Sequence, residues 1–218
     1  MKSKYSIMLF TALCFCLSAQ NAFSQTAKDV FTNSETPIFY LGIDFTQARL
    51  IDDATADQID IRDRQFDGIN DVIVSEAKKY DLAGAFHKSY VDHDLGLVAK
   101  RNEKANAEAI KSTNTGDFHR FTENDVNTLV KGFDFGGKSG VGLLFITEAL
   151  SKSQKAAAVW VTLVDMKSKK VLMTERMVGS VNKFGGFGFR NYWASAFKNI
   201  IDDIEKKKYS EWKSKYGS

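Results

Sequence analysis

Apolar positions along the chain fall into continuous runs and into helical spacing, the two patterns of a sheet covered by helices. Residues 38–45 (IFYLGIDF) are almost continuously apolar, which predicts a strand buried on both faces. Residues 141–150, 156–165 and 171–178 are rich in apolar and β-branched side chains, and each run predicts a further strand. The polar segment 166–170 predicts a hairpin turn between the last two strands.

Two stripes of apolar side chains at intervals of three to four residues predict amphipathic helices. The first stripe consists of Phe66, Ile69, Ile73, Ala77 and Tyr80. The second stripe, in a long C-terminal helix, consists of Trp193, Phe197, Ile200, Ile201 and Ile204. Thr122 followed by Asp125 indicates the capped start of another helix.

The segments between these elements carry weaker patterns. Residues 49–65 are charged and irregular, 82–91 predict a short strand, and 98–110 predict a helix because Ala, Glu and Lys dominate them. The predicted order is β-α-β-α-β-β-β-α. The fold class is therefore α/β (α+β), with a mixed sheet, helices packed on it, and a C-terminal β-hairpin before the long helix.

The first residues have the pattern of a signal peptide. Lys2 and Lys4 precede an apolar run at 7–17, and Ala22 and Ser24 are small residues suited to a cleavage site. The run spans about 16 Å as a helix, against about 30 Å for a bilayer core, which disfavours a membrane anchor. We therefore expect residues 1–24 to be removed by cleavage near Ser24, leaving a periplasmic or secreted protein.

Cysteine and charge counts limit the chemistry of the exported chain. Cys14 and Cys16, the only cysteines, lie in the predicted signal, so no disulfide, thiol nucleophile or cysteine-bound metal is expected after cleavage. With 30 basic and 27 acidic side chains, the balance is typical of neither a nucleic-acid binder nor a disordered chain. We expect a flexible N-terminus at 25–36, one globular domain at 37–208 and a C-terminal tail at 209–218.

A phosphate-loop pattern, G-x-x-x-x-G-K-S, starts at Gly132 and includes Lys138. A phosphate-binding loop requires a strand before it and a helix after it, so that the helix N-terminus faces the phosphates. Here the predicted helix comes first and the predicted strand follows. We therefore interpret the match as a coincidence and predict no nucleotide and no other cofactor.

Two histidines and their acidic neighbours offer a metal-site hypothesis. His87 and His93 would share one face of a strand, because their spacing is even, and Asp92 and Asp94 flank His93. The alternative is a solvated polar loop without any bound ion. Other acidic pairs, such as Asp52 with Asp53, are interpreted as solvated surface.

An aromatic and glycine-rich loop precedes the last helix. Phe184, Phe187 and Phe189 alternate with glycines there, and exposed rings would form a binding surface. The alternative is that the rings cover the edge of the core while glycine makes the turn. The basic tail from Lys206 onwards permits membrane contact that is peripheral at most.

The C-terminal half resembles the curli-secretion lipoprotein and penicillin-binding-protein-activator group. The resemblance lies in residues 157–165 (AAVWVTLVD), residues 170–174 (KVLMT), Gly179 and the helix from Tyr192. It implies an exported accessory protein of the cell envelope without a catalytic site, and it assigns no functional residue.

These patterns together favour a non-enzymatic envelope accessory or binding protein, whose loops contact a protein or a cell-wall component. The alternative is an exported hydrolase or metal-binding protein that uses His87, His93 and nearby carboxylates.

Overall fold

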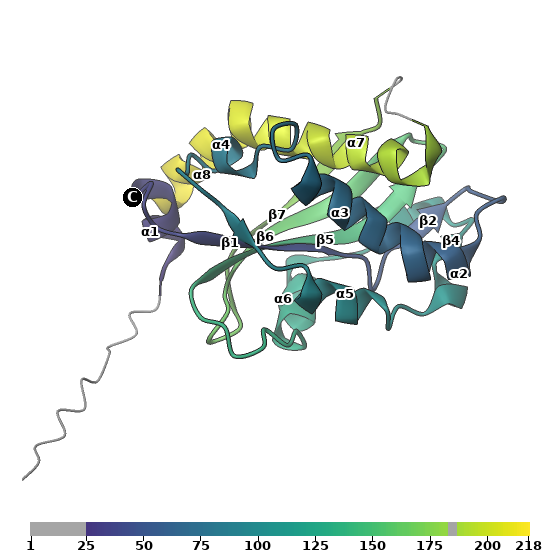
Figure 1. Ribbon diagram of the computed structural model, residues 1–218, viewed down its shortest axis with the longest axis horizontal. Coiled ribbons are helices and arrows are strands. Elements are labelled where there is room, and N and C mark those ends of the chain that lie inside the picture. The colour runs from purple at the N-terminus through teal and green to yellow at the C-terminus, as the bar shows by residue number, and fades with distance from the viewer. Residues whose placement is uncertain (1–24, 183–186) are drawn as a thin grey trace, which may run out of the picture.

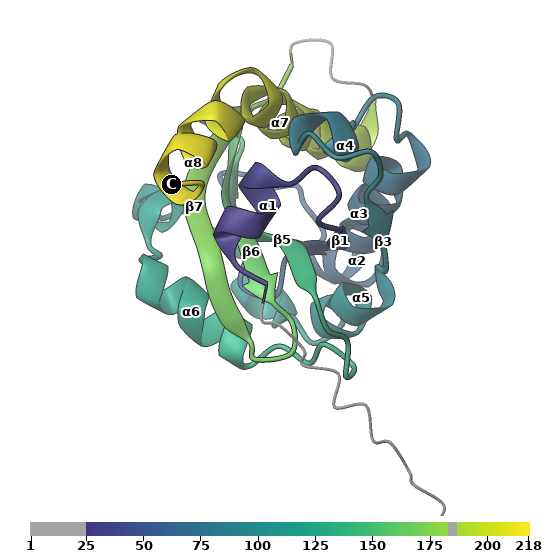
Figure 2. The same cartoon turned by 90° about the vertical axis from the view of Figure 1, so that its left-hand side faces the viewer.

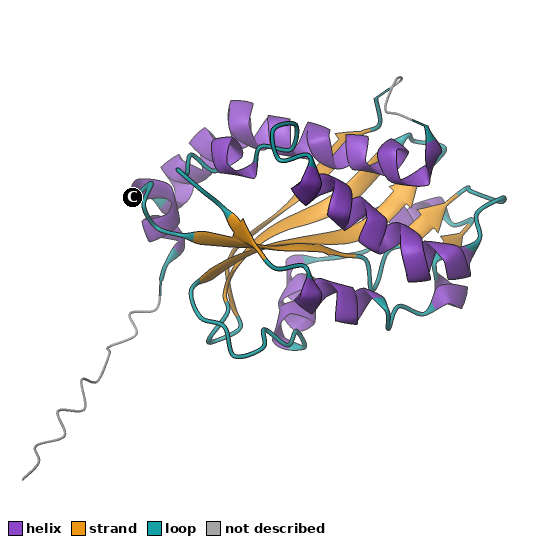
Figure 3. Ribbon diagram, in the orientation of Figure 1, coloured by secondary structure: helices purple, strands orange, loops and turns teal. Residues whose placement is uncertain are grey.

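Within residues 25–182 and 187–218, which the computed structural model describes, seven strands form one mixed sheet (Figures 1 and 3). This architecture confirms the predicted α/β class. The strands are β1 (Ile38–Asp44), β2 (Arg49–Ile51), β3 (Asp92–His93), β4 (Lys111–Ser112), β5 (Val141–Ser151), β6 (Ala156–Asp165) and β7 (Lys170–Ser180).

The long strand β5 organises the sheet. Along one side of β5 lie β1 and then β2, both parallel to it, while β3 pairs with β1 and β4 pairs with β2, again in parallel. Along its other side β6 and β7 form an antiparallel hairpin extension. The sheet is therefore parallel on one side of β5 and antiparallel on the other.

Helices cover both faces of the sheet, which explains why β5 and β6 are buried along their whole length (Figure 2). The α-helices are α1 (Ala27–Thr32), α2 (Gln58–Asp60), α3 (Phe66–Ser75), α4 (Leu82–Ala85), α5 (Gly96–Asn102), α6 (Glu123–Lys131), α7 (Gly188–Asp203) and α8 (Tyr209–Tyr216). One face carries α1, α3, α4, α7 and α8, and the other carries α5 and α6.

Short π-helical segments, Ile61–Gln65 and Ile204–Lys208, join α2 to α3 and α7 to α8. Two 3-10 helices, Ala107–Ala109 and Thr115–His119, flank β4. Thr122 and Asp125 form the predicted capping box at the start of α6.

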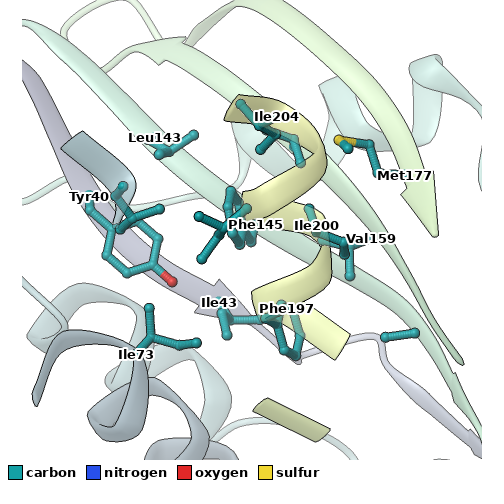
Figure 4. Packing of buried hydrophobic residues seen from close by; sticks show 14 of the residues in the cluster. Tyr40, Ile43, Ile73, Leu143, Phe145, Val159, Met177, Phe197, Ile200 and Ile204 are labelled. Carbon is teal, nitrogen blue, oxygen red and sulfur yellow. The ribbon is translucent and has the colours of Figure 1, made fainter. Parts of the chain in front are cut away.

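The larger core lies between the sheet and α7, as the C-terminal apolar stripe predicts. Phe197 of α7 meets Phe145 of β5 and the ring of Phe45, and Phe45 stacks on Phe66 of α3 at 4.3 Å between centroids. Figure 4 shows Phe197 and Ile200 directed at the sheet beside Phe145. Both predicted apolar stripes therefore face this core at most of their positions.

Two buried asparagines complete the hydrogen bonding of β1 beyond its short pairing with β3. Asn70 accepts from the backbone N–H of Ile43 at 2.7 Å, and Asn102 accepts from the N–H of Phe45 at 2.8 Å. Both amides also donate to the carbonyl of Ile43 at 3.1 Å. Because an unpaired buried backbone group costs about 1–3 kcal/mol, these side chains stand in for a missing strand.

A buried ion pair lies beneath the segment that leads into α6. Glu148 has no exposed surface and occupies a bulge in β5, where the register with β6 shifts. Its carboxylate lies 2.7 Å from Nε of Arg176 and accepts a 2.5 Å hydrogen bond from the backbone N–H of Phe121. The backbone N–H of Arg120 donates to the same oxygen. The bulge therefore directs a charge inward that fastens the neighbouring loop.

Both ends of the described chain belong to the domain, which corrects the predicted flexible segment 25–36 and tail 209–218. Thr26 and Asp29 form a capping box for α1, and Phe31 is buried against Tyr209 and Trp212 of α8. The prediction failed because a six-residue helix is too short to show a period, and it is stabilised by packing rather than by propensity.

Lys88 fixes the end of α1. Its side chain is only 8% exposed, and its Nζ donates to the carbonyls of Val30 at 2.6 Å and Asn33 at 2.7 Å. Burial lowers the pKa of the ammonium to about 8, opposed by the nearby carboxylate of Glu35.

Three intermediate predictions also need correction. Segment 82–91 begins with the helix α4, because the Asp81 carboxylate accepts from the N–H of Gly84 and caps a helical turn. Segment 98–110 contains α5 and a separate 3-10 helix, because Asn102 turns inward to β1. Segment 49–65 contains β2, α2 and a π-helical segment rather than irregular chain alone.

Candidate functional site

The carboxyl ends of β2, β4 and β5 meet at one edge of the sheet. Ile51 at the end of β2 is in register with Ser112 of β4 on one side and with Ser151 of β5 on the other. From β2 the chain runs through α3 on one face to β3 beside β1, and from β4 it runs through α6 on the opposite face to β5. The strand order thus reverses at β2, and ligands of open α/β sheets bind outside such a reversal.

A cavity of about 450 Å³ lies at this point. Its walls are the residues that end or follow two neighbouring parallel strands, Asp52, Asp53, Ala54, Lys111, Ser112 and Thr113. Carboxylate, ammonium and hydroxyl groups therefore surround one space, which we call the switch-point cavity. Figure 1 shows β2, β4, α2 and the first turns of α7 at the same end of the molecule.

Asp52 ties the end of β2 to the turn after β5. Its backbone has a positive φ of 59°, which aspartate tolerates better than most residues. The carboxylate accepts a 2.5 Å hydrogen bond from the hydroxyl of Ser153, which lies 3.2 Å from the hydroxyl of Ser151. The position of this acid therefore depends on contacts between two loops.

Asp53 faces a lysine that also contacts aromatic rings. Nζ of Lys152 lies 3.7 Å from the Asp53 carboxylate and 4.0 Å from the ring centroid of Tyr192. Burial, with a smaller contribution from Asp53, raises the pKa of the Tyr192 hydroxyl. The ring of Trp193 lies beneath, 5.7 Å from the same ammonium. Next to Asp53, a charge pair is therefore combined with an aromatic surface.

The β4 side of the cavity is also fixed by hydrogen bonds. Nζ of Lys111 donates to the carbonyl of Ala54 at 2.8 Å, directly across the cavity wall. The hydroxyl of Ser112 donates to Asp117 at 2.6 Å and accepts from the backbone N–H of Asn114 at 3.0 Å. The polar groups are thus held in place before any ligand arrives.

The described residues on either side of segment 183–186 lie at the same edge. Ser180, the last residue of β7, pairs with Ala156 of β6, and Ala156 pairs with the end of β5. Phe187 is fully exposed, whereas Phe189 is half-buried with its ring 6.3 Å from that of Trp193. Phe184 lies outside the described residues. Each of the two alternatives from the sequence therefore describes one ring. Phe187 is exposed to solvent, as a binding surface requires, whereas Phe189 covers the core.

The predicted metal ligands are not brought together. His87 follows α4 with a positive φ of 50°, and its ring stacks on Tyr209 at 3.9 Å. His93 is exposed on β3, so the two histidines share no strand. Among residues 25–182 and 187–218, no group of three or more His, Cys, Asp or Glu side chains is placed to hold a metal ion.

The acids beside His93 have other partners. Asp92 accepts from the backbone N–H of His93 at 2.8 Å. Asp94 pairs with Lys138 at 3.0 Å, and the hydrogen bond from that lysine holds the pKa of Asp94 below its ordinary value. Lys138 also lies 4.9 Å from the ring of Phe39.

The phosphate-loop pattern has the flanking elements that the sequence predicts. The helix α6 precedes it and the strand β5 follows it, the reverse of a phosphate-binding loop. Phe133 and Phe135 inside the pattern are buried, with their rings 4.7 Å apart. Its lysine is engaged by Asp94, so the loop serves the packing of α6 against the sheet.

The chain matches no protein-family model, and a search of curated proteins finds no match either. No helix in the described part of the chain is both long enough and apolar enough to cross a membrane.

Proposed function

We propose that the protein is an exported, non-enzymatic binding protein of the cell envelope that holds a cell-wall fragment in the switch-point cavity. The observation that carries the proposal is the lining of this cavity: Asp52, Asp53 and Lys111 all border a space of about 450 Å³. Cell-wall glycopeptides carry sugar hydroxyls, carboxylates and ammonium groups, and each has a complementary partner in such a lining.

The aromatic border supports the same ligand class. Binding sites combine a few fixed polar groups with aromatic side chains that supply contact area. Tyr192 contacts Lys152, the partner of Asp53, and so provides a ring close to the cavity, while hydrogen bonds within the walls hold the polar groups. The resemblance to envelope accessory proteins agrees with this assignment and stays a prediction.

The two cavity acids already have partners, and this favours binding over hydrolysis. Asp52 accepts a hydrogen bond from Ser153, and Asp53 is paired with Lys152. A hydrolase needs an acid and a base free to act on opposite sides of a bond. His87 and His93, the groups of the alternative function, lie on other elements and do not line this cavity.

Co-sedimentation with purified, insoluble cell wall tests the proposal. The protein should sediment with the wall, and Asp53→Asn combined with Lys111→Met should reduce the bound fraction at least fivefold. Asp203→Asn, which removes an exposed carboxylate at the end of α7, is the control and should bind like the parent. No sedimentation of the parent, or equal binding by the cavity variant, would refute the cavity as the binding site.

The exposed ring of Phe187 favours a second candidate, a protein partner bound by this loop. Phe187→Ala should change cell-wall binding less than twofold if the cavity is the site. Cross-linking in the native envelope distinguishes the two candidates, since loss of a specific protein adduct in Phe187→Ala alone supports the protein partner. Release of soluble wall fragments by the parent, but not by Asp53→Asn, would instead indicate a hydrolase.

Export itself has a direct test. If residues 1–24 are a cleaved signal, the intact mass of the protein recovered outside the cytoplasm corresponds to a chain that starts at Gln25. Recovery of the full-length chain alone would contradict this part of the proposal.

A further inference from the structure

A second cavity, of about 210 Å³, lies near the amino end of β1, away from the carboxyl ends that form the switch-point cavity. Its walls come from the end of α3, the start of α4 and the segment leading into β3. They include Ile73, Leu82 and Val91, and Tyr40 of β1 contributes to the lining from the sheet. Most of these side chains are apolar or aromatic.

Tyr40 has a buried hydroxyl without a partner. The residue has no exposed surface, and its oxygen makes no hydrogen bond within the described structure. Figure 4 shows this hydroxyl pointing towards Ile73, which lines the same cavity. Buried polar groups in folded proteins are almost always paired, so an orphan beside a cavity indicates a place for a ligand atom.

The entrance of the cavity is formed by exposed residues. Tyr90 is 68% exposed and His93 is exposed, while the carboxylate of Asp81 is used to cap α4 through the N–H of Gly84. Tyr80, which is buried, also lines the cavity, so the floor is aromatic and aliphatic, a surface that favours an uncharged molecule.

The volume limits the size of the ligand. An apolar cavity of about 150 Å³ in another protein is sufficient to bind benzene. At about 210 Å³, this cavity has room for a ring that carries a small substituent. We propose that it binds a small uncharged molecule with an aromatic or aliphatic body and one oxygen that accepts a hydrogen bond from Tyr40. This site is independent of the cell-wall site.

Two probes of equal shape test the inference. Acetophenone carries the acceptor oxygen, and α-methylstyrene has a CH₂ group in its place. Titration of the protein followed by methyl NMR should shift the signals of Ile73 and Leu82 with both probes. Acetophenone should bind about threefold to tenfold more tightly, the range expected for one net hydrogen bond.

Two variants locate the binding. Tyr40→Phe keeps the ring and should remove the preference for acetophenone without weakening α-methylstyrene. Ala77→Trp, at an exposed position of the cavity wall, should abolish binding of both probes while the fold is kept. The inference is overturned if neither probe shifts the methyl signals, if Ala77→Trp still binds, or if the parent shows no preference between the probes. Cell-wall binding should be unaltered in both variants, which separates the two proposals.

Discussion

Neutralising Glu148 should destabilise the fold strongly, because its charge is balanced only inside the protein. The carboxylate is fully buried, lies 2.7 Å from Arg176 and receives backbone N–H groups from Arg120 and Phe121. Glu148→Gln keeps the size and an acceptor oxygen but leaves the guanidinium of Arg176 without a counter-charge. Removing one partner of a buried pair costs about 3–5 kcal/mol, against a total domain stability of about 5–15 kcal/mol.

For a chain of this size each kcal/mol lowers the melting temperature by about 2–4 °C, so the expected fall is about 6–20 °C. Urea unfolding followed by circular dichroism measures the free energy, and calorimetry measures the midpoint. Glu205→Gln is the matched control, because Glu205 is exposed. Surface changes of this kind stay within about 0.5 kcal/mol.

A double-mutant cycle separates the ion pair from the loss of either side chain. Arg176→Met removes the cation and retains an apolar stem, so alone it leaves the Glu148 carboxylate without its guanidinium partner. The double variant should cost less than the sum of the singles, with a coupling of at least about 1 kcal/mol. If Glu148→Gln melts like Glu205→Gln, or if the two single changes are additive, the buried pair is not what holds the loop before α6.

Three further predictions concern other parts of the molecule. Phe197→Ala should lower the free energy of unfolding in urea by about 3–5 kcal/mol, because its ring is fully buried, whereas Lys198→Ala should change it little. The pKa of Lys88 is lowered to about 8 from 10.5, so between these values the unfolded chain binds more protons than the folded one. The stability of the parent relative to Lys88→Met, measured by urea unfolding, should therefore rise from pH 8 towards pH 10.5, and a fall would contradict the assigned burial. Calorimetry with magnesium–ATP should show no binding heat for the parent or for Lys138→Ala, because the flanking elements are reversed.

The long strands were predictable because helices cover both faces of the sheet. A strand buried on two sides must be apolar at every position, so residues 141–150 and 156–165 stand out from their surroundings. The final helix was predictable for a related reason, since one face of it alone meets the sheet. In each case the local pattern of apolar residues follows from burial of that element against the rest of the fold.

The predictions failed where a single side chain decides the local structure. Asn102 ends α5 by turning towards the backbone of β1, and nothing in the composition of 98–110 indicates that acceptor. Phe31 holds α1 through rings contributed by α8, at the other end of the chain. Such contacts join residues far apart in sequence, so local propensity does not report them.

The switch-point cavity was missed for a topological reason. Asp52 with Asp53 looks in sequence like Asp202 with Asp203, a pair of adjacent acids beside apolar residues. The second pair lies at the end of α7, whereas the first follows β2, where β4 and β5 converge. Because β2 has only three residues and β4 only two, neither is long enough to show a recognisable pattern of apolar and polar positions in the sequence.

The brevity of these strands also explains why polar chemistry gathers at this edge. Residues beyond the ends of β2 and β4 are no longer buried in the sheet, so they can be polar. The neighbouring strand β5 still holds their loops close together. Charges placed there remain near solvent and yet face each other from separate segments, as Asp53 faces Lys152. A ligand that inserts between them exchanges weak, partly exposed ion pairs for contacts of its own, at little cost to the fold. Two short parallel strands beside the long strand β5 therefore give this edge of the sheet polar side chains that can accept a polar ligand.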